Sequence, residues 1–344
     1  MIINWLNKIA GYLSSDLAMD LGTANTLVHV KDRGIILDEP SVVAVSSNNG
    51  AVEAVGMEAK QMYGRTPHQV QAIRPMKDGV IADFEVTSKM ITYFTKKALD
   101  RFWLIKPRMV VGIPTCITQV EKKAVIDAAV LAGVREVYLV QEPMSAAIGV
   151  GMPVHKPEGN MVIDIGGGTT DVAVISLSAI AYGESLRVAG DEMDEAIVRY
   201  MRLNHQLSIG IFEAERAKIA VGSAFPMVEK LKTEVKGLSV RSGVPESIVV
   251  SDEEMREAMR EPVGAIVSVA LRALEQTPPE LAADIHTNGI YLTGGGALIR
   301  GLDKMIEEQT GLKVYIPESP LISIVKGAGI VMDNFEDMKK VCIN

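Results

Sequence analysis

With 344 residues, 48% of them hydrophobic, the chain can bury a sizeable core and is long enough for two domains or one large bilobed one. Its net charge of −8 argues against nucleic-acid binding, which needs clustered Lys and Arg, and suits a soluble cytoplasmic protein. The two cysteines, Cys116 and Cys342, exclude a disulfide framework, indicate a reducing compartment and are interpreted as packing residues.

Residues 1–13, MIINWLNKIAGYL, predict an amphipathic helix. Its apolar residues recur at spacings of three and four, namely Ile2, Leu6, Ile9 and Leu13. The segment is too short to span a bilayer, and it lacks the charged start and the cleavage site of a signal peptide. The helix can dock on the core or lie in a membrane interface, and Trp5 and Tyr12 are residue types that favour the interface.

The next stretch, Ala18–Val30 (AMDLGTANTLVHV), predicts a strand, a turn that contains Gly22 and a second strand. Residues 34–83 are expected to form a small αβ insert, and residues 87–102 a helix. The apolar run Trp103-Leu104-Ile105 follows just before a proline. Three large apolar residues in a loop form either a covered corner of the core or an exposed patch.

Strands predicted at 109–113 and 136–140 alternate with helices at 119–132 and 144–149. Together with the hairpin, this order predicts a mixed sheet covered by helices. Glu142 lies where the second strand ends, which is the usual place for chemistry in such sheets. Its other interpretation is an acid at a helix N-terminus that favours the macrodipole.

A second hairpin is predicted for Met161–Ser176, MVIDIGGGTTDVAVIS. It matches the first, with Asp164 at the place of Asp20, Gly166 at the place of Gly22 and Thr169 at the place of Asn25. A glycine turn with bare N–H groups can cradle a polyphosphate, and a carboxylate at the end of the strand before it can hold the water shell of a divalent cation. The chain therefore looks internally duplicated, with two hairpins that grip one phosphate chain across a cleft. The alternative is two solvent-exposed hairpins with glycine in their turns.

Helices are predicted to begin at Gly190–Asp194, where the acids are interpreted as capping residues, and to cover 213–222 and 253–276. Glu215 and Lys218 lie three residues apart on one helix face, which by itself indicates a surface ion pair.

A third glycine turn follows the strand in Ile290–Leu298, IYLTGGGAL, and a helix is predicted for 298–310. Such a turn lets a flat ring or a ribose approach the backbone. The glycine-bearing helix 325–332 is expected to pack against 146–151, because small residues allow close approach. None of the turns carries a Lys, and neither familiar nucleotide-binding motif fits, so Mg²⁺ would have to neutralise most of the phosphate charge.

The two hairpins, the TGGG turn and QEPMSAAIGVG at 141–151 resemble the actin, Hsp70 and sugar-kinase superfamily and, within it, the bacterial actins. Further similar stretches are DLGTANTLV, EPSVVAV, RPMKDGVIADF, AGDEMDEAI and AERAKIAVGSA. The resemblance runs from Asp16 to about Asp333. It implies an α/β, actin-like duplicated ATPase fold, in which two domains with a small insert each surround a nucleotide cleft.

The expected organisation is a membrane helix at 1–15, a first domain at 16–153 with the insert at 34–83, a second domain at 154–320 with an insert at about 190–252, and C-terminal helices at 321–344 that return to the first domain. The resemblance implies ATP and Mg²⁺ as cofactors.

The resemblance also assigns residues. Glu142 would polarise or orient the attacking water, assisted by Thr169, and Asp20 and Asp164 would hold Mg²⁺ through water. The nucleotide-binding residues would be Thr23, Ala24, Asn25, Gly167, Gly168, Thr169, Glu215, Arg216, Ala217, Lys218, Gly295, Gly296, Ala297 and Leu298. The membrane contacts would be Ile2, Trp5, Leu6, Ile9, Trp103, Leu104 and Ile105.

The implied function is a slow ATPase that polymerises with itself, binds the cytoplasmic face of the cell membrane and works with membrane proteins of the cell-wall elongation machinery to direct rod shape. No nucleic-acid partner is expected. A small-molecule kinase of the same fold is the alternative, and it would need a second substrate. An Hsp70-like chaperone would need a substrate-binding domain that 344 residues cannot hold.

Overall fold

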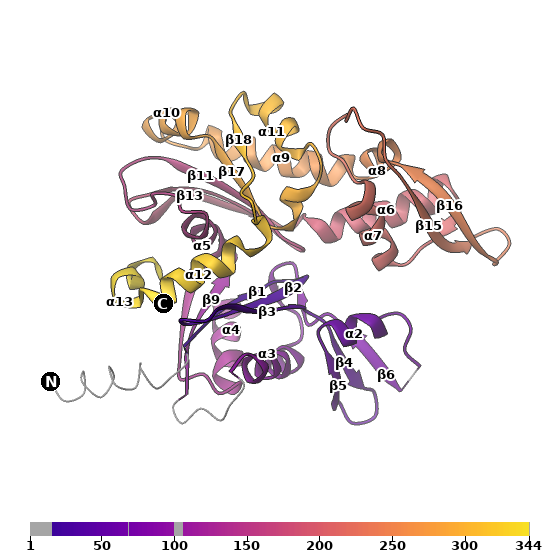
Figure 1. Ribbon diagram of the computed structural model, residues 1–344, viewed down its shortest axis with the longest axis horizontal. Coiled ribbons are helices and arrows are strands. Elements are labelled where there is room, and N and C mark those ends of the chain that lie inside the picture. Colours follow the sequence, from indigo (N-terminus) through magenta and orange to yellow (C-terminus); the bar gives the residue numbers. More distant parts are fainter. Residues whose placement is uncertain (1–15, 68, 100–105, 344) are drawn as a thin grey trace. The chain divides into compact units, whose positions relative to one another are not determined.

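The computed structural model describes residues 16–67, 69–99 and 106–343, which form two compact units (Figure 1). Unit 1 takes its described residues from Met1–Pro157, Ile175–Ile180 and Leu321–Asn344, and unit 2 consists of Glu158–Val174 and Ala181–Pro320. The predicted helix at 1–13 and the segment Trp103–Ile105 lie outside the described residues.

Unit 1 contains a five-stranded mixed sheet in the order β10-β9-β1-β2-β3. Its strands are β1 (Leu17–Leu21), β2 (Asn25–Val30), β3 (Gly34–Pro40), β9 (Arg108–Ile113) and β10 (Glu136–Gln141). β1 pairs antiparallel with β2 and parallel with β9, so the sheet is mixed, as predicted. β1 is buried along its whole length, which places the end of the first hairpin strand at the centre of the sheet.

Helices cover both faces of this sheet (Figure 1). They are α3 (Phe84–Leu99), α4 (Gln119–Leu131), α5 (Glu142–Gly149) and α12 (Ser323–Asp333), and the short α13 (Phe335–Met338) and η3 (Lys339–Val341) follow α12. A Cβ on Gly327 of α12 would lie 1.7 Å from the Ser145 carbonyl oxygen of α5, and one on Gly149 would lie 2.0 Å from the Ser323 carbonyl oxygen. The predicted close approach of these glycine-bearing helices is confirmed.

A small sheet in the order β5-β4-β6 has its own core in unit 1. It consists of β4 (Val43–Ser46), β5 (Val52–Val55), β6 (Val70–Ile73) and the helix α2 (Met57–Met62), and the short hairpin of β7 (Met76–Lys77) and β8 (Val80–Ile81) follows. The small sheet begins only at β4, because β3 pairs with β2 of the main sheet.

The second five-stranded sheet has the order β13-β12-β11-β17-β18. Its strands are β11 (Asn160–Ile165), β12 (Thr170–Ser176), β13 (Ala179–Leu186), β17 (Ile290–Thr293) and β18 (Val314–Tyr315). β11 pairs parallel with β17, as β1 does with β9. Because a three-strand meander and two later strands occupy the same places in both sheets, the predicted duplication is confirmed.

Unit 2 adds six helices, a short 3-10 helix and a small sheet in the order β14-β15-β16. They are α6 (Gly190–Asn204), α7 (Ile211–Val221), α8 (Asp252–Ala258), α9 (Arg260–Glu275), α10 (Pro279–Asn288), α11 (Leu302–Thr310), η1 (Gly295–Leu298), β14 (Leu207–Ser208), β15 (Lys232–Ser239) and β16 (Pro245–Ser251). A further 3-10 turn, η2 (Pro320–Ile322), precedes α12.

Two helix predictions in unit 2 were wrong. The single helix expected at 253–276 is divided at Met259, because Pro262 cannot donate a backbone hydrogen bond and its ring would crowd the carbonyl of Ala258. The helix expected from Leu298 begins only at Leu302, after Gly301 takes a left-handed φ of 76°. Gly295–Leu298 forms a 3-10 turn instead.

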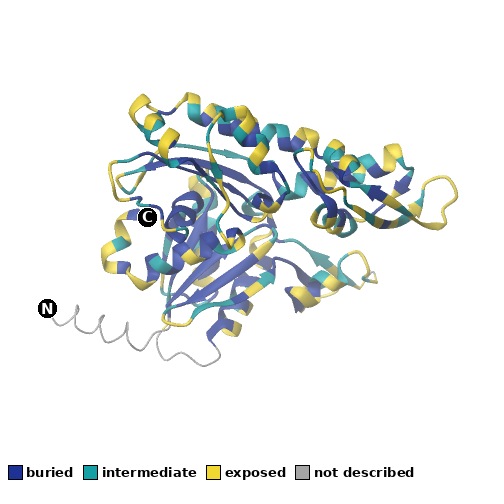
Figure 2. Cartoon of the chain, turned by 45° about the horizontal axis from the view of Figure 1, so that its top comes forward, coloured by how far each residue is buried: buried dark blue, intermediate teal, exposed yellow. Residues whose placement is uncertain are grey.

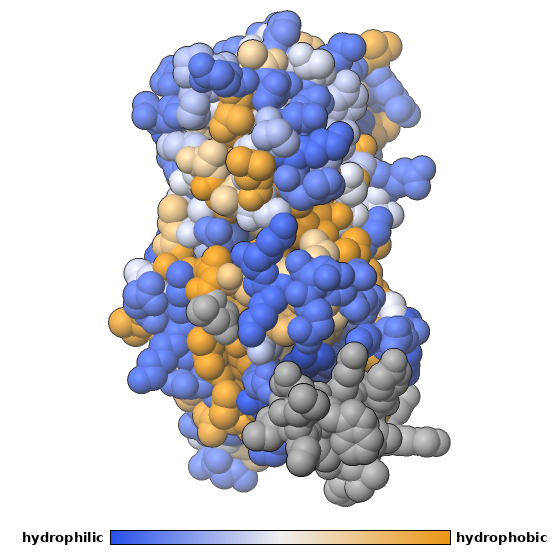
Figure 3. All heavy atoms as spheres, turned by 90° about the vertical axis from the view of Figure 1, so that its left-hand side faces the viewer, coloured by the Kyte–Doolittle hydropathy of each residue, from blue (hydrophilic) through white to orange (hydrophobic). Residues whose placement is uncertain are grey.

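The strands of both main sheets are mostly buried, while exposed residues follow the outer sides of helices and the loops (Figure 2). On the face that Figure 3 shows, polar side chains separate the apolar surface into patches.

Across the described ranges, no helix combines the length and apolarity needed to cross a membrane. The interpretation of both cysteines as packing residues is wrong for Cys116, which is exposed; Cys342 is half-buried, and burial raises the pKa of its thiol to about 11.

Candidate nucleotide site

The first hairpin turn joins β1 to β2 in unit 1. Asp20, at the end of β1, is buried, and a Cβ on Gly22 would lie 2.6 Å from the carbonyl oxygen of Asn25, so this turn needs glycine. The Thr23 hydroxyl accepts a hydrogen bond from the Gly79 N–H at 2.9 Å. The exposed Asn25 donates from Nδ2 to Asp38 at 2.9 Å. The side chains of Thr23 and Asn25, on either side of Ala24, therefore anchor this turn to Gly79 and Asp38.

Glu142 lies close to the same part of unit 1. It is the first residue of α5, directly after β10, and is 7% exposed. Gly112 of β9 is the register partner of Asp20, and a Cβ there would lie 3.5 Å from Cγ of Glu142. Gly112 thus leaves room for the side chain of Glu142 near the end of the strand that carries Asp20. The helix begins two residues earlier than predicted, so a macrodipole role for Glu142 also fits.

The second hairpin turn joins β11 to β12 in unit 2. The Gly166 N–H donates to the Thr169 carbonyl at 2.8 Å, which closes a turn of three glycines. Asp164 is 2% exposed and accepts a hydrogen bond from the Thr293 hydroxyl at 2.7 Å. The pKa of the Asp164 carboxyl is raised to about 7, mainly by burial and also by the charge of Asp171, although the Thr293 hydrogen bond lowers it. A cation near this carboxylate would stabilise its charged form.

Magnesium fits these residues only as a hydrated ion. Asp20 and Asp164 each end a buried strand beside a glycine turn, which is where a carboxylate can hold the water shell of a cation. Within residues 16–67, 69–99 and 106–343, however, no group of three His, Cys, Asp or Glu side chains could hold a metal directly. Phosphate and water would supply the remaining ligands.

The third turn packs directly against the end of β11. Gly294 has a φ of 78°, and a Cβ there would lie 2.3 Å from the carbonyl oxygen of Ile165. A Cβ on Gly296 would lie 2.2 Å from Cγ2 of the same isoleucine. Only glycine allows this contact, which brings the third turn beside the second hairpin. Gly295 is exposed at the turn, Leu298 is also exposed and Ala297 is buried in the core.

The segment Glu215–Lys218 of α7 sends its side chains in different directions. Lys218 donates from Nζ to the Gly190 carbonyl at 2.8 Å and forms an ion pair with Asp194 at 2.9 Å. Arg216 instead contacts Glu213, Thr233 and the Glu234 carbonyl, the last two on β15. Ala217 is buried in the core, and Glu215 is half-buried.

Of the acids at the start of α6 that were interpreted as capping residues, Glu192 is a cap and Asp194 is not. Glu192 accepts a hydrogen bond from the Ala189 N–H at 2.8 Å, as a cap does. Asp194 is buried and faces Lys218 instead. Burial raises the pKa of the Asp194 carboxyl to about 7, although the Lys218 ammonium lowers it. The sequence had indicated only a capping role for Asp194 and none for Thr293, although Asp194 lies beyond the first turn of α6 and is too late for a cap.

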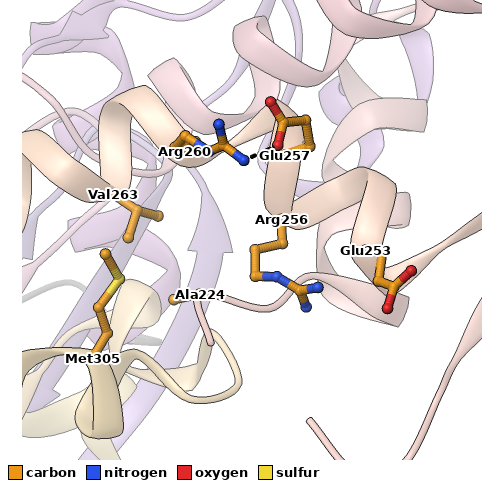
Figure 4. A pocket seen from close by; sticks show the side chains of 7 residues that line it. All are labelled: Ala224, Glu253, Arg256, Glu257, Arg260, Val263 and Met305. Carbon is orange, nitrogen blue, oxygen red and sulfur yellow. Dashed lines mark hydrogen bonds and ion pairs between the residues drawn. The ribbon is translucent and has the colours of Figure 1, made fainter. Parts of the chain in front are cut away.

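Two cavities in the described residues hold none of the predicted site residues. One of about 370 Å³ in unit 2 is lined by Ala224, Glu253, Arg256, Glu257, Arg260, Val263 and Met305 (Figure 4). Its charges are paired locally, since Arg260 contacts Glu257 and Arg256 lies 3.7 Å from the buried Asp252. A larger cavity of about 820 Å³ lies along β5 and α3 of unit 1. The candidate site is therefore defined by backbone turns and strand ends.

Similarity to known proteins covers almost the whole chain. Residues 14–340 match the family described as MreB/Mbl protein. The cell shape-determining protein MreB of Escherichia coli (strain K12) is 50% identical over 333 residues, 95% of this chain and 96% of that protein. The cell shape-determining protein Mbl of Bacillus subtilis (strain 168) is 48% identical over 325 residues, 94% of this chain and 98% of that protein.

Solved structures of the same family have the same fold as this chain. MreB5 of Spiroplasma citri bound to ADP matches with a TM-score of 0.89 at 32% identity, over 95% of this chain and 98% of that one. The same protein bound to AMPPNP matches with a TM-score of 0.88. The predicted actin-like duplicated fold is confirmed by these matches.

Proposed function

The chain belongs to the MreB/Mbl family of actin-like cytoskeletal proteins, and we propose that it binds and slowly hydrolyses Mg-ATP, assembles with itself into filaments and directs rod cell shape and cell-wall synthesis. The observation that carries this proposal is the Asp-Gly hairpin, which recurs at the same place in two sheets of the same strand order. MreB5, bound to ADP and to AMPPNP, supports nucleotide as the ligand. The alternative of a small-molecule kinase has no support among relatives named as cell shape-determining proteins.

In this proposal the two hairpin turns bind the phosphates through their backbone N–H groups. Glycine at 167 and 168 leaves these N–H groups open to an anion. In unit 1 the corresponding donors are the backbone N–H groups of Thr23–Asn25. Bound Mg²⁺ would neutralise phosphate charge that no Lys of the turns can neutralise. Asp20 and Asp164 hold its water shell, because each carboxylate ends a strand beside a turn.

Hydrolysis is assigned to Glu142 with Thr169. Glu142 is a buried carboxylate at the start of a helix, so its oxygens are held in few orientations and can accept hydrogen bonds from one water. A carboxylate is a weak base at its ordinary pKa, so orienting the water matters more than removing its proton. The hydroxyl of the buried Thr169 assists in this positioning.

Adenosine is assigned to Glu215 and Lys218 on α7 and to Gly295–Leu298. Gly295 is exposed, so a ribose or a ring can lie against its backbone. Arg216 and Ala217 contribute backbone only, because their side chains contact β15 and the core.

Filament assembly and membrane binding complete the proposal. Four of the apolar residues in the predicted helix at 1–13 recur at the helical spacing and are worth about 1.5–3 kcal/mol each at full burial, and less in an interface; they are Ile2, Leu6, Ile9 and Leu13. Ordering that helix costs backbone entropy, and Lys8 is its one basic residue, so a single copy would bind weakly. Many copies along a filament would bind together, which makes attachment at the inner face of the membrane depend on assembly.

Sedimentation with ATP, in the presence and absence of liposomes, tests the proposal. Filaments should pellet above a threshold protein concentration, and phosphate release should rise with assembly and need no second substrate. ATP turnover that appears only with an added phosphoryl acceptor would favour the kinase.

Deleting residues 1–13, or replacing Trp5 and Leu6 with acidic residues, should abolish co-sedimentation with liposomes and leave ATP binding intact. Any residual lipid binding is assigned to Trp103–Ile105. If the truncated protein is insoluble or unfolded, the helix belongs to the core and the membrane assignment fails.

A further inference from the structure

The start of α6 contacts the phosphate turn of unit 2. The Gly190 N–H donates to the Gly166 carbonyl at 3.3 Å, and the Asp191 N–H donates to the Gly167 carbonyl at 2.7 Å. A Cβ on Gly190 would lie 3.3 Å from the same Gly166 oxygen, so glycine lets the helix start lie close to the turn. These two hydrogen bonds orient the peptide groups of the turn.

Lys218 of α7 contacts the same helix start. Its ammonium donates to the Gly190 carbonyl at 2.8 Å and lies 2.9 Å from the Asp194 carboxylate. The exposed fractions of the two side chains are only 11% for Lys218 and 4% for Asp194. Charges attract more strongly here than in water, and an ammonium on a flexible stem has no fixed orientation of its own. Asp194 therefore determines where the amino group of Lys218 lies.

We propose that Asp194 is a positioning residue of the nucleotide site, which holds Lys218 against Gly190 and so fixes the start of α6 on the Gly166–Gly167 turn. The inference rests on the proposed function in so far as Lys218 and the turn bind nucleotide. Asp194 acts through Lys218 alone. The pair links the helix assigned to adenosine with the turn assigned to the phosphates.

The charges around Asp194 make this link depend on pH. The pKa of its carboxyl is raised to about 7, mainly by burial and also by the charges of Glu215 on α7 and Asp191 on α6, although Lys218 lowers it. Because this pKa lies above the ordinary value of 3.8, the carboxyl takes up a proton as the pH falls through about 7. The ion pair is thus present above pH 7 and lost below it, and nucleotide affinity should fall in the same direction.

A double-mutant cycle on the full chain tests the pair, with Mg-ADP as the ligand in isothermal titration at pH 8. Asp194→Asn keeps the shape of the side chain and should weaken Mg-ADP binding about tenfold, since a charge-assisted contact is lost. Lys218→Met should weaken binding at least as much. Adding Asp194→Asn to Lys218→Met should change the affinity by less than about twofold, because nothing is left to position.

Glu195→Gln is the matched control, because Glu195 is an exposed acid on the same helix, 3.8 Å from Arg199. It should bind Mg-ADP like the parent. If Asp194→Asn weakens binding by the same factor with and without Lys218, the role is structural only and the inference is wrong.

Amide hydrogen exchange of the nucleotide-free protein tests the same link without any ligand. The amides of Gly190 and Asp191 should exchange about tenfold faster in Asp194→Asn than in the parent, while amides of α9 keep their rates. Unchanged exchange at these two amides would overturn the inference even if the protein binds nucleotide. A parent that fails to bind Mg-ADP would overturn the proposed function, and this exchange experiment would still decide the inference.

The parent protein gives a third measurement in case Asp194→Asn does not fold. Its Mg-ADP affinity should fall more steeply between pH 8 and pH 6 than that of Lys218→Met, in which the titration of Asp164 remains but the Asp194–Lys218 pair is absent. Parallel pH profiles for the two proteins would contradict the inference.

Discussion

The two hairpins occupy equivalent places in equivalent sheets, yet different chemistry holds them. In unit 1 the turn is held by side chains, since Thr23 accepts from Gly79 and Asn25 donates to Asp38. In unit 2 the turn consists of glycines, and backbone groups of α6 hold it. Duplication thus preserved the backbone of the turn, which an anion needs, and left the supporting contacts free to diverge.

The two sheets also differ in the acid that follows their last strand, which is β10 in unit 1 and β18 in unit 2. In unit 1, Glu142 begins α5 directly after β10 and is buried. In unit 2, an irregular segment separates β18 from α12, and its acid, Glu318, is exposed. A buried acid next to a turn can orient a water, and a solvated one cannot hold it in place. The acid that orients the water is therefore assigned to unit 1, although both units are assigned phosphate contacts.

A helical glycine serves close approach at Gly327 of α12 in unit 1 but not at Gly264 of α9 in unit 2, and this difference gives the largest expected effect. Gly327→Ala would place a Cβ 1.7 Å from the Ser145 carbonyl oxygen, so α12 and α5 would have to separate. We expect the free energy of unfolding to fall by about 3 kcal/mol in denaturant titrations. Gly264→Ala on α9 is the control, because a Cβ there meets nothing within 4 Å, and it should stabilise by about 0.5–1 kcal/mol. Equal effects would refute the close helix contact.

The next largest effect separates hydrolysis from binding. Glu142→Ala should lower the rate of ATP hydrolysis about 100-fold or more through loss of water positioning, while Mg-ATP affinity stays largely intact. Glu318→Ala is the matched control in unit 2 and should hydrolyse at the parent rate. Single-turnover phosphate release, with affinity from isothermal titration, checks both. If Glu142→Ala hydrolyses like the parent, its carboxylate is only a helix cap.

A smaller effect tests whether both hairpins bind the metal nucleotide. Asp20→Ala and Asp164→Ala should each weaken Mg-nucleotide binding about tenfold, because each removes a negative charge that faces a hydrated cation. Polymerisation should fall with binding. In excess chelator the parent should lose most of its affinity, and the two variants should then differ little from it. Unchanged Mg-ATP affinity in both variants would refute the model of two hairpins on one nucleotide.

The smallest effect concerns the two buried hydroxyls. Thr293→Val removes the hydrogen bond to Asp164 and should cost about 1 kcal/mol in the free energy of unfolding. It should also raise the pKa of Asp164, because that hydrogen bond lowers it. Thr23→Val should cost a similar amount in unit 1 and leave the pKa of Asp164 unchanged. Carbon-detected NMR titration of the nucleotide-free protein measures this pKa, and equal values in both variants would show that the hydrogen bond is absent.

The amino-acid sequence by itself determined the parts of the protein that depend on local backbone requirements. Gly22, Gly294 and Gly296 stand where a side chain would collide with the backbone or with Ile165, so residue type alone marks the turns. The alternating strands and helices around Glu142 indicated its place at a strand end. The division of the helix at Met259 was also readable, since Pro262 and its effect on the preceding turn are local.

Only the tertiary structure decided which side chains meet. Thr293 bonds to Asp164 across 129 residues, and Lys218 reaches Gly190 across 28. Arg216 and Lys218 are two residues apart on one helix, yet the first contacts β15 and the second contacts α6. A helix sends such neighbours in different directions, and what each meets depends on the packing of segments that the local sequence does not specify.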